Sequence, residues 1–171
     1  MPPPILTGFQ HRVVIGLAEM AVSNNPSAIL TTYALGSCIG VVLYDPVMRV
    51  GGLLHAMLPD STIDPVKAQA QPGMFVDTGM PALLRGACQM RADRRRLLIF
   101  VVGGARIMDD RNLFNIGGRN VAAFAEWLRL ENLHVNGEQV GGQVNRTVSL
   151  TVGTGRITLK VAGVTQEVVL C

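Results

Sequence analysis

The sequence predicts an α+β fold, a single-domain sandwich of β-sheets with two main helices packed on them. Segments with the β-branched, alternating patterns of strands outnumber those with helical spacing, and the helical segments lie in the middle of the chain. Of the 171 residues, 49% are hydrophobic and 16% charged, so the chain is long and apolar enough to bury a core. We expect one domain over residues 1–171, with its core at about 13–161 between short N- and C-terminal extensions.

Four strands are expected in the first half of the chain, where valine, isoleucine, leucine and threonine dominate four short segments. These segments are 11–20, 28–33, 39–44 and 49–57. Turn-forming residues stand at 23–26 and at 45–48, where aspartate precedes proline. The following segment, 59–73, is polar and contains three prolines. We expect it to form a loop or a mobile flap beside the fourth strand.

Both predicted helices lie further along the chain. Asp77 and Thr78 offer an N-cap for the first helix, and the second covers 115–132. The apolar stripes consist of Met80, Leu83, Leu84, Ala87 and Cys88 in the first helix and of Val121, Phe124, Ala125 and Leu128 in the second. A continuous apolar run predicts a buried strand at 97–102. Two alternating segments, 148–152 and 157–161, flank glycines and predict a hairpin.

The charge pattern argues against nucleic-acid binding. The net charge of +3 and the pI of about 9.1 are only mildly basic, and aromatic residues make up 5%. The one dense basic run, 94–96, is typical of a solvated helix end. The longest apolar run, 38–44, is far shorter than the roughly 20 residues that cross a membrane, and the first residues lack signal-peptide features. We therefore expect a cytoplasmic protein without direct membrane insertion.

The three cysteines, Cys38, Cys88 and Cys171, form an odd and widely spaced set, which argues against a disulfide framework. No CxxC or HxxxH spacing occurs, so we do not expect a zinc site. Cys88 is interpreted as a core residue, and Cys171 as a terminal residue without a function. The glycine pairs 103–104 and 117–118 lack phosphate-loop patterns and are interpreted as turns or as points of close backbone approach.

Segment 31–59 carries the residues of a candidate chemical site. If Tyr44 and Arg49 close a hairpin, the same register places Cys38 directly opposite His55. A thiol and an imidazole so placed form the nucleophile and base of covalent catalysis. A register slip of one residue would turn His55 to the other face of the sheet.

Three further residues complete this hypothesis. Gly36 and Ser37 precede Cys38, and a glycine there permits a turn that aims amide N–H groups at a developing oxyanion. The hydroxyl of Thr32 is placed to accept a hydrogen bond from the second ring nitrogen of His55 and so to fix its tautomer. The alternatives are ordinary: an inert core cysteine, a structural histidine and a threonine with β propensity. The residues by themselves leave both interpretations open.

Several motifs resemble those of the CheD family, the chemoreceptor glutamine deamidases of bacterial chemotaxis. They are YALGSCIGVVLYDP, GGLLHAMLP, VDTGMPALL, VVGGARIM, FNIGGRN and VGGQVNRTVSLTVGTGRI, and they run in the family's order over nearly the whole chain. The resemblance implies Cys38 as nucleophile, His55 as base and Thr32 as the third residue of the triad. It also implies a sandwich similar to that of deamidating bacterial toxins and no cofactor. Gly118 and Val102 depart from the family's usual glutamate and aromatic residue, and neither belongs to the triad.

The function implied by this resemblance is deamidation of protein glutamine. The substrate is the cytoplasmic domain of methyl-accepting chemotaxis receptors, and glutamine becomes glutamate through a thioester. One alternative is a binding or regulatory partner of a CheC-type chemotaxis phosphatase with little turnover, and another is a different thiol enzyme with a deep pocket. An intact triad and a low pKa of the cysteine would favour the enzyme. We expect a monomer.

Overall fold

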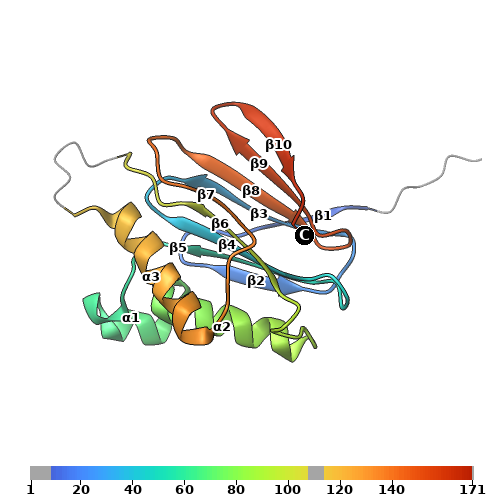
Figure 1. Cartoon of the computed structure of the whole chain (residues 1–171), viewed down its shortest axis with the longest axis horizontal. Coiled ribbons are helices and arrows are strands. Elements are labelled where there is room, and N and C mark those ends of the chain that lie inside the picture. Colours follow the sequence, from blue (N-terminus) through green and yellow to red (C-terminus); the bar gives the residue numbers. More distant parts are fainter. Residues whose placement is uncertain (1–8, 108–113, 171) are drawn as a thin grey trace, which may run out of the picture.

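A computed structural model describes residues 9–107 and 114–170 and shows three layers (Figure 1). The outer sheet consists, in spatial order, of β1 (His11–Val14), β3 (Ala28–Leu35), β8 (Arg146–Thr151), β9 (Arg156–Val161) and β10 (Val164–Val168). The central sheet consists of β2 (Met20–Ser23), β5 (Val50–Ala56), β4 (Ile39–Asp45), β6 (Leu98–Gly103) and β7 (Gly137–Val140). The helices α1 (Pro65–Ala70), α2 (Val76–Gln89) and α3 (Ile116–Glu131) lie on the far face of the central sheet. The predicted α+β sandwich with two main helices is confirmed.

Strand β4 lies between β5 and β6 and separates two apolar cores. All its residues are buried, and successive side chains point to opposite faces of the sheet. Ile39, Val41 and Leu43 face the helices, whereas Val42 and Tyr44 face the outer sheet. The central sheet is therefore covered on both sides, which explains why its middle strands are apolar throughout.

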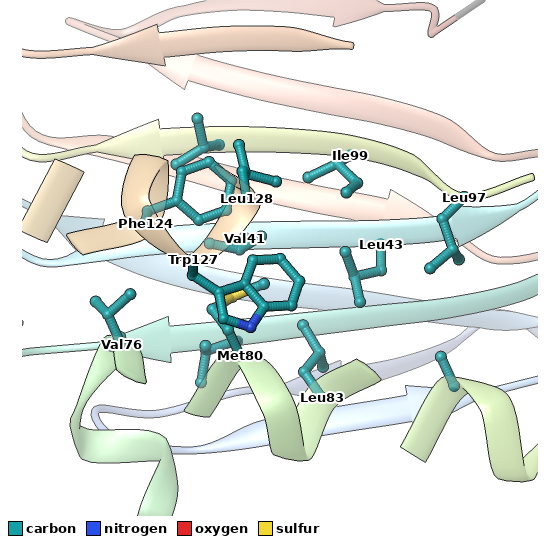
Figure 2. Close-up of a cluster of buried hydrophobic side chains, with 14 of the residues drawn as sticks. Val41, Leu43, Val76, Met80, Leu83, Leu97, Ile99, Phe124, Trp127 and Leu128 are labelled. Atoms are coloured by element: carbon teal, nitrogen blue, oxygen red, sulfur yellow. The ribbon is translucent and has the colours of Figure 1, made fainter. Parts of the chain in front are cut away.

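The two main helices pack on the central sheet through a few large side chains. Figure 2 shows Met80 and Leu83 of α2 and Phe124 and Trp127 of α3 gathered over Val41. The rings of Phe124 and Trp127 stack with their centroids 6.4 Å apart. The predicted stripes are confirmed at Met80, Leu83 and Phe124, which fix the helices on the sheet.

Two residues that were predicted to lie on the buried apolar stripes of the helices are exposed instead. Cys88 is exposed and not part of the core, because it lies about 100° around the helix from the buried Ala87. Ala125 is exposed as well, and Trp127 takes the buried place on α3. Cys171 lies outside the described residues.

The predicted start of the first helix was also wrong. α2 begins at Val76, with Phe75 at the N-cap position, so Asp77 and Thr78 lie in its first turn. The Asp77 carboxylate accepts hydrogen bonds from the main-chain N–H and the hydroxyl of Ser61, at 2.9 and 2.7 Å. An aspartate in the first turn still complements the helix dipole.

Segment 11–20 forms two strands and not one. β1 pairs in parallel with β3 of the outer sheet, whereas β2 pairs antiparallel with β5 of the central sheet. Ala18, at φ 63°, belongs to the turn between them. Apolar residues continue through this turn, so the periodicity does not reveal that the chain crosses from one sheet to the other.

Other polar segments are more ordered than the sequence predicts. Segment 59–73 contains α1 between two 3-10 turns, η1 (Ser61–Ile63) and η2 (Pro72–Met74), and aspartates cap η1 and α1. β7 and β10 were not predicted, because both are edge strands with polar or exposed residues. The basic run 94–96 lies beyond α2 and not at its end, and Arg96 pairs with the buried Asp45 at 2.8 Å.

The predicted register of the β4–β5 hairpin was wrong by two residues. Tyr44 pairs with Gly51 and Asp45 with Val50, so Gly40, and not Cys38, lies directly opposite His55. The Asp45 carboxylate accepts hydrogen bonds from the main-chain N–H groups of residues 47 and 48, and residue 49 adopts φ 52°, which closes a four-residue loop. A shift of two residues preserves the face of each side chain in the hairpin, and Cys38 lies one residue before the first paired residue of β4.

Candidate active site

Thr32 and His55 meet in the space between the two sheets, and Cys38 packs against the core that fills the same space. Thr32, in β3 of the outer sheet, is fully buried, and His55, in β5 of the central sheet, is 2% exposed. Cys38 immediately precedes β4, is partly buried and packs against the core between the sheets. The sequence thus predicted a set of residues that two different sheets contribute.

The hydrogen bonds of Thr32 fix the tautomer of His55. The Thr32 hydroxyl lies 2.7 Å from the main-chain oxygen of Ile15 and 2.7 Å from Nδ1 of His55. A carbonyl oxygen only accepts, so the single hydroxyl proton of Thr32 goes to Ile15. Nδ1 must then donate to the threonine oxygen. The neutral imidazole consequently carries its lone pair on Nε2.

Burial keeps this imidazole neutral. Desolvation lowers the pKa of His55 from 6.5 to about 4, because the imidazolium ion would lose its hydration inside the protein. Nε2 is buried and has no hydrogen-bond partner among the described residues. The site therefore holds an unprotonated nitrogen base at neutral pH.

The turn between β1 and β2 holds His55 through its main chain. Ala18 N donates to the carbonyl oxygen of His55 at 2.9 Å, and His55 N donates to the carbonyl oxygen of Glu19 at 3.0 Å. The same turn begins at Ile15, whose oxygen receives the Thr32 proton. The turn that the sequence analysis missed therefore orients both the main chain and the ring of the histidine.

The thiol of Cys38 is protonated in the same environment. Burial raises its pKa above the model-compound value of 9.0, and a hydrogen bond from its own main-chain N–H offsets only part of this effect. A low pKa of the cysteine would favour an enzyme, whereas the pKa of Cys38 is raised. The two pKa shifts favour a neutral thiol and a neutral imidazole over a preformed ion pair.

The residues around Cys38 have their carbonyl groups bound and their amide groups free. The carbonyl oxygens of Gly36 and Cys38 accept from the main-chain N–H groups of Ala105 and Gly104, at 2.8 and 2.9 Å. The carbonyl oxygen of Ser37 accepts from Nδ2 of the Asn120 side chain at 2.9 Å. In the described part of the chain, no main-chain oxygen accepts from the N–H of residues 36, 37 or 38. The N–H groups of residues 36 and 37 are thus available to an external acceptor, and that of residue 38 contacts only its own thiol.

The glycine pairs mark close backbone contacts, as the sequence predicts. Gly103 has φ 107°, and a Cβ there would collide with the carbonyl oxygen of Cys38. A Cβ at Gly117 would collide with the carbonyl oxygen of Ala105. These contacts let β6 and α3 approach the Cys38 segment. Their partners could not be read from the sequence, because they come from distant segments.

An apolar hollow opens beside the Cys38 segment. It is lined by Ser37, Ala105, Arg106, Ile107, Phe114, Asn115, Ile116 and Gly117. Phe114 is 69% exposed, so the hollow has an apolar side that water reaches. Within residues 9–107 and 114–170, no three histidine, cysteine or acidic side chains gather as a metal site would require.

The fold and the site together define a class of protein. It is an α+β sandwich with a cysteine thiol and a histidine of fixed tautomer between its two sheets. Residues 57–161 match the sequence model of the family described as CheD chemotactic sensory transduction. A Solibacter usitatus protein named "Probable chemoreceptor glutamine deamidase CheD" is 46% identical over 159 residues, 93% of this chain and 94% of that protein. A Syntrophus aciditrophicus protein, "Probable chemoreceptor glutamine deamidase CheD 1", is 46% identical over 151 residues, 88% of this chain and 94% of its own. The chain belongs to the CheD family.

The family match and the matches to the two relatives differ in whether they include the candidate site residues. The family match begins after Cys38 and His55, whereas the two relatives match spans long enough to include Thr32, Cys38 and His55. Among solved structures, a Neisseria meningitidis protein of the DUF152 family aligns with a TM-score of 0.42 at 11% identity, over 77% of this chain and 62% of that one. A likeness at that level supports no argument about fold or function.

Proposed function

We propose that this protein deamidates glutamine side chains in the cytoplasmic domains of chemoreceptors, with Cys38 as nucleophile, His55 as base and Thr32 as the residue that orients the base. One observation carries the proposal: a buried imidazole whose Nδ1 is engaged by Thr32 and whose Nε2 has no partner among the described residues, in a sandwich where Cys38 packs against the core between the same two sheets. The family membership and the names of its relatives supply the substrate class.

The reaction begins with a proton transfer from the Cys38 thiol to Nε2 of His55. The thiolate attacks the carboxamide carbon of the glutamine, and the N–H groups of residues 36–38 donate to the resulting oxyanion. The C–N bond then breaks as the imidazolium gives its proton to the leaving ammonia, which leaves a thioester. His55 next takes a proton from water, which hydrolyses the thioester to glutamate and returns the thiol.

Proton transfer must accompany substrate binding in this mechanism. The structure shows no hydrogen bond from Cys38 to Nε2. Catalytic hydrogen bonds are frequently long before substrate binds and tighten in the complex. A raised thiol pKa and a lowered imidazole pKa both favour the neutral pair until the substrate arrives.

The surroundings of the site fit a protein surface as substrate. Ile107, Phe114 and Ile116 line the hollow beside Ser37, and Phe114 is 69% exposed. Apolar side chains around a polar centre suit a helical receptor segment that presents a glutamine between apolar neighbours. None of the described helices is long and apolar enough to cross a membrane. We expect the protein to meet the receptor in the cytoplasm.

Mass spectrometry of a chemoreceptor cytoplasmic fragment tests the proposal directly. Wild type should convert glutamine to glutamate at defined peptides, and Cys38→Ala should leave every glutamine unchanged while it keeps the fold. Cys88→Ala is the matched variant, because this cysteine is exposed on α2 and should be dispensable. Turnover by Cys38→Ala would remove the nucleophile assignment. Failure of folded wild type on a cognate receptor would overturn the activity.

The partner and the oligomeric state are part of the same proposal. We expect a monomer in solution that also binds a CheC-type phosphatase where the organism has one. Light scattering of the isolated protein and of its mixture with such a phosphatase would test both expectations. A dimer of the isolated protein would contradict the first, and the absence of a complex would contradict the second.

A further inference from the structure

We propose that Asn120 is a positioning residue that sets the spacing between the nucleophile and the base. The inference rests on the proposed function, since it concerns how Cys38 and His55 are held for that reaction. Asn120 lies in α3 and is fully buried. Asn120 is the last residue of the motif FNIGGRN, but the motif does not reveal its partners, because the residues that it contacts are 63 and 83 positions away.

A single amide group of Asn120 bridges the two segments that carry the reacting groups. Its Nδ2 donates to the carbonyl oxygen of Ser37 at 2.9 Å and to that of Met57 at 3.0 Å. Ser37 directly precedes Cys38, and Met57 is two residues beyond His55. Each of the two protons on Nδ2 therefore holds one side of the site.

The orientation of this side chain follows from its partners. Both partners are carbonyl oxygens, which only accept, so the nitrogen and not the oxygen of the amide must face them. Oδ1 is left buried without a hydrogen-bond partner among the described residues. A buried acceptor without a donor is unfavourable, and an apolar side chain of similar size would avoid it. The contribution of the Asn120 side chain is therefore its two hydrogen-bond donors, the protons on Nδ2.

The bridge lies where the strand ladder ends. The last pair between β4 and β5 joins Ile39 to Ala56. Beyond that pair the chains separate, because Met57 N donates to Met74 on one side and Cys38 accepts from Gly104 on the other. No direct hydrogen bond joins residues 36–38 to residues 57–58 in the described chain. The Asn120 amide replaces the missing ladder pair.

Helix α3 provides a rigid base for this bridge. Gly117, one turn before Asn120, lets the helix backbone contact the carbonyl oxygens of Gly104 and Ala105. One turn after Asn120, the buried Phe124 packs into the core on the central sheet. Gly104 and Ala105 also donate hydrogen bonds to the Cys38 segment. Helix α3, the end of β6 and the site are therefore connected through these two residues.

Loss of the bridge should affect the chemical step more than binding. Without the donor, the peptide group between Ser37 and Cys38 is free to rotate, which turns the N–H of Cys38, and the end of the His55 strand is no longer held at Met57. A misplacement of about 1 Å between reacting groups lowers rates by on the order of 100-fold. The apolar hollow beside Ser37 does not include Asn120, so receptor binding should change little.

Steady-state kinetics on a chemoreceptor cytoplasmic fragment with Asn120→Ala tests this inference. We expect kcat to fall on the order of 100-fold while KM changes less than about threefold. Asn120→Ser retains one donor for one carbonyl and should be intermediate, and it keeps the test open if the alanine variant unfolds. Asn136→Ala is the matched variant, because Asn136 binds the main chain of Ile99 at 2.8 Å near the other end of β6.

The outcomes separate the inference from the proposed function. Asn136→Ala should lose stability and keep the wild-type kcat. A folded Asn120→Ala with wild-type kcat would overturn the inference and leave the deamidase assignment intact, as would an effect confined to KM. A decrease in kcat no larger than that of an equally destabilised Asn136→Ala would also overturn it. Inactive wild type would overturn the proposed function and, with it, the inference.

Discussion

At the scale of single residues, the Thr32 hydroxyl has the largest consequence, because it binds the main chain on one side and His55 on the other. Thr32→Val keeps the shape of the side chain and removes the acceptor of Nδ1–H. The imidazole is then free to carry its proton on either nitrogen, and the lone pair on Nε2 is no longer assured. We expect kcat to fall on the order of 100-fold, the lower end of what general acid–base catalysis contributes.

The neighbouring threonine provides a matched comparison. Thr31 is equally buried, but its hydroxyl contacts Ser149 and Arg12 on the opposite face of the outer sheet. Thr31→Val should therefore retain the wild-type kcat, and Thr32→Ser should restore most of the activity that Thr32→Val loses. Equal activities of the two valine variants, measured by glutamate formation, would remove Thr32 from the site.

The lowered pKa of His55 predicts a pH dependence of stability. The unfolded chain binds a proton at about pH 6.5, whereas the folded protein binds it only near pH 4. The unfolded state therefore binds more protons in this window, and the free energy of unfolding decreases as the pH falls from about 6.5 to about 4. The decrease amounts to about 3 kcal/mol at most. Denaturant unfolding of wild type and His55→Gln between these pH values measures it.

His55→Gln should flatten the dependence of the unfolding free energy on pH in this window, and an unchanged slope would contradict the assignment.

The carboxyl group of Asp45 makes a second contribution to the pH dependence of stability, which appears only at lower pH. Burial raises the pKa of Asp45, but hydrogen bonds from the Arg96 side chain and from main-chain N–H groups outweigh it and hold the pKa at about 2. Stability from Asp45 is present above its unfolded pKa of about 3.8 and is lost as the pH falls toward 2.

At the scale of elements, the end of β6 decides the shape of the nucleophile segment. Gly103 has φ 107° and contacts the carbonyl group of Cys38 without room for a side chain. Gly103→Ala should destabilise the protein by more than about 2 kcal/mol, because left-handed strain and a backbone collision add together. It should also lower kcat, because Cys38 must move.

Gly163→Ala isolates the strain from the collision. Gly163 has φ 79°, and nothing lies within 4 Å of a Cβ there. This variant should lose only about 1–2 kcal/mol and keep its activity. Thermal unfolding and glutamate formation of the two variants check the prediction, and equal losses of activity would contradict it.

At the scale of the whole molecule, the two cores share the central sheet and should unfold together. Leu83 of α2 belongs to the core under the helices, and Leu150 of β8 belongs to the core between the sheets. Both are fully buried, so Leu83→Ala and Leu150→Ala should each cost about 2–5 kcal/mol. Trp127, the only tryptophan in the chain, reports on the helix layer by fluorescence, and circular dichroism reports on all layers.

We expect the two probes to give coincident transitions for wild type and both variants. The reason is that β4 contributes alternate residues to both cores, so neither layer keeps its partner when the other is lost. A Leu150→Ala protein that loses its strand signal before its tryptophan signal changes would contradict this coupling.

The sequence alone determined which segments form the main strands and helices, and it predicted that Cys38, His55 and Thr32 belong to one site. Periodicity and local spacing carry this information, because they depend on neighbours along the chain. Recognition of the family motifs then connected these residues with deamidation, in agreement with the names of the relatives.

Only the tertiary structure decided the register, the tautomer and the protonation of the site. The Asp45 loop shifted the hairpin by two residues, and the turn at Ala18 divided one expected strand between two sheets. Ile15 and Asn120 reach the site from segments that local patterns do not connect with it. Burial then moved both pKa values toward neutral forms. Such features arise from contacts and desolvation between distant segments, and a linear pattern contains neither.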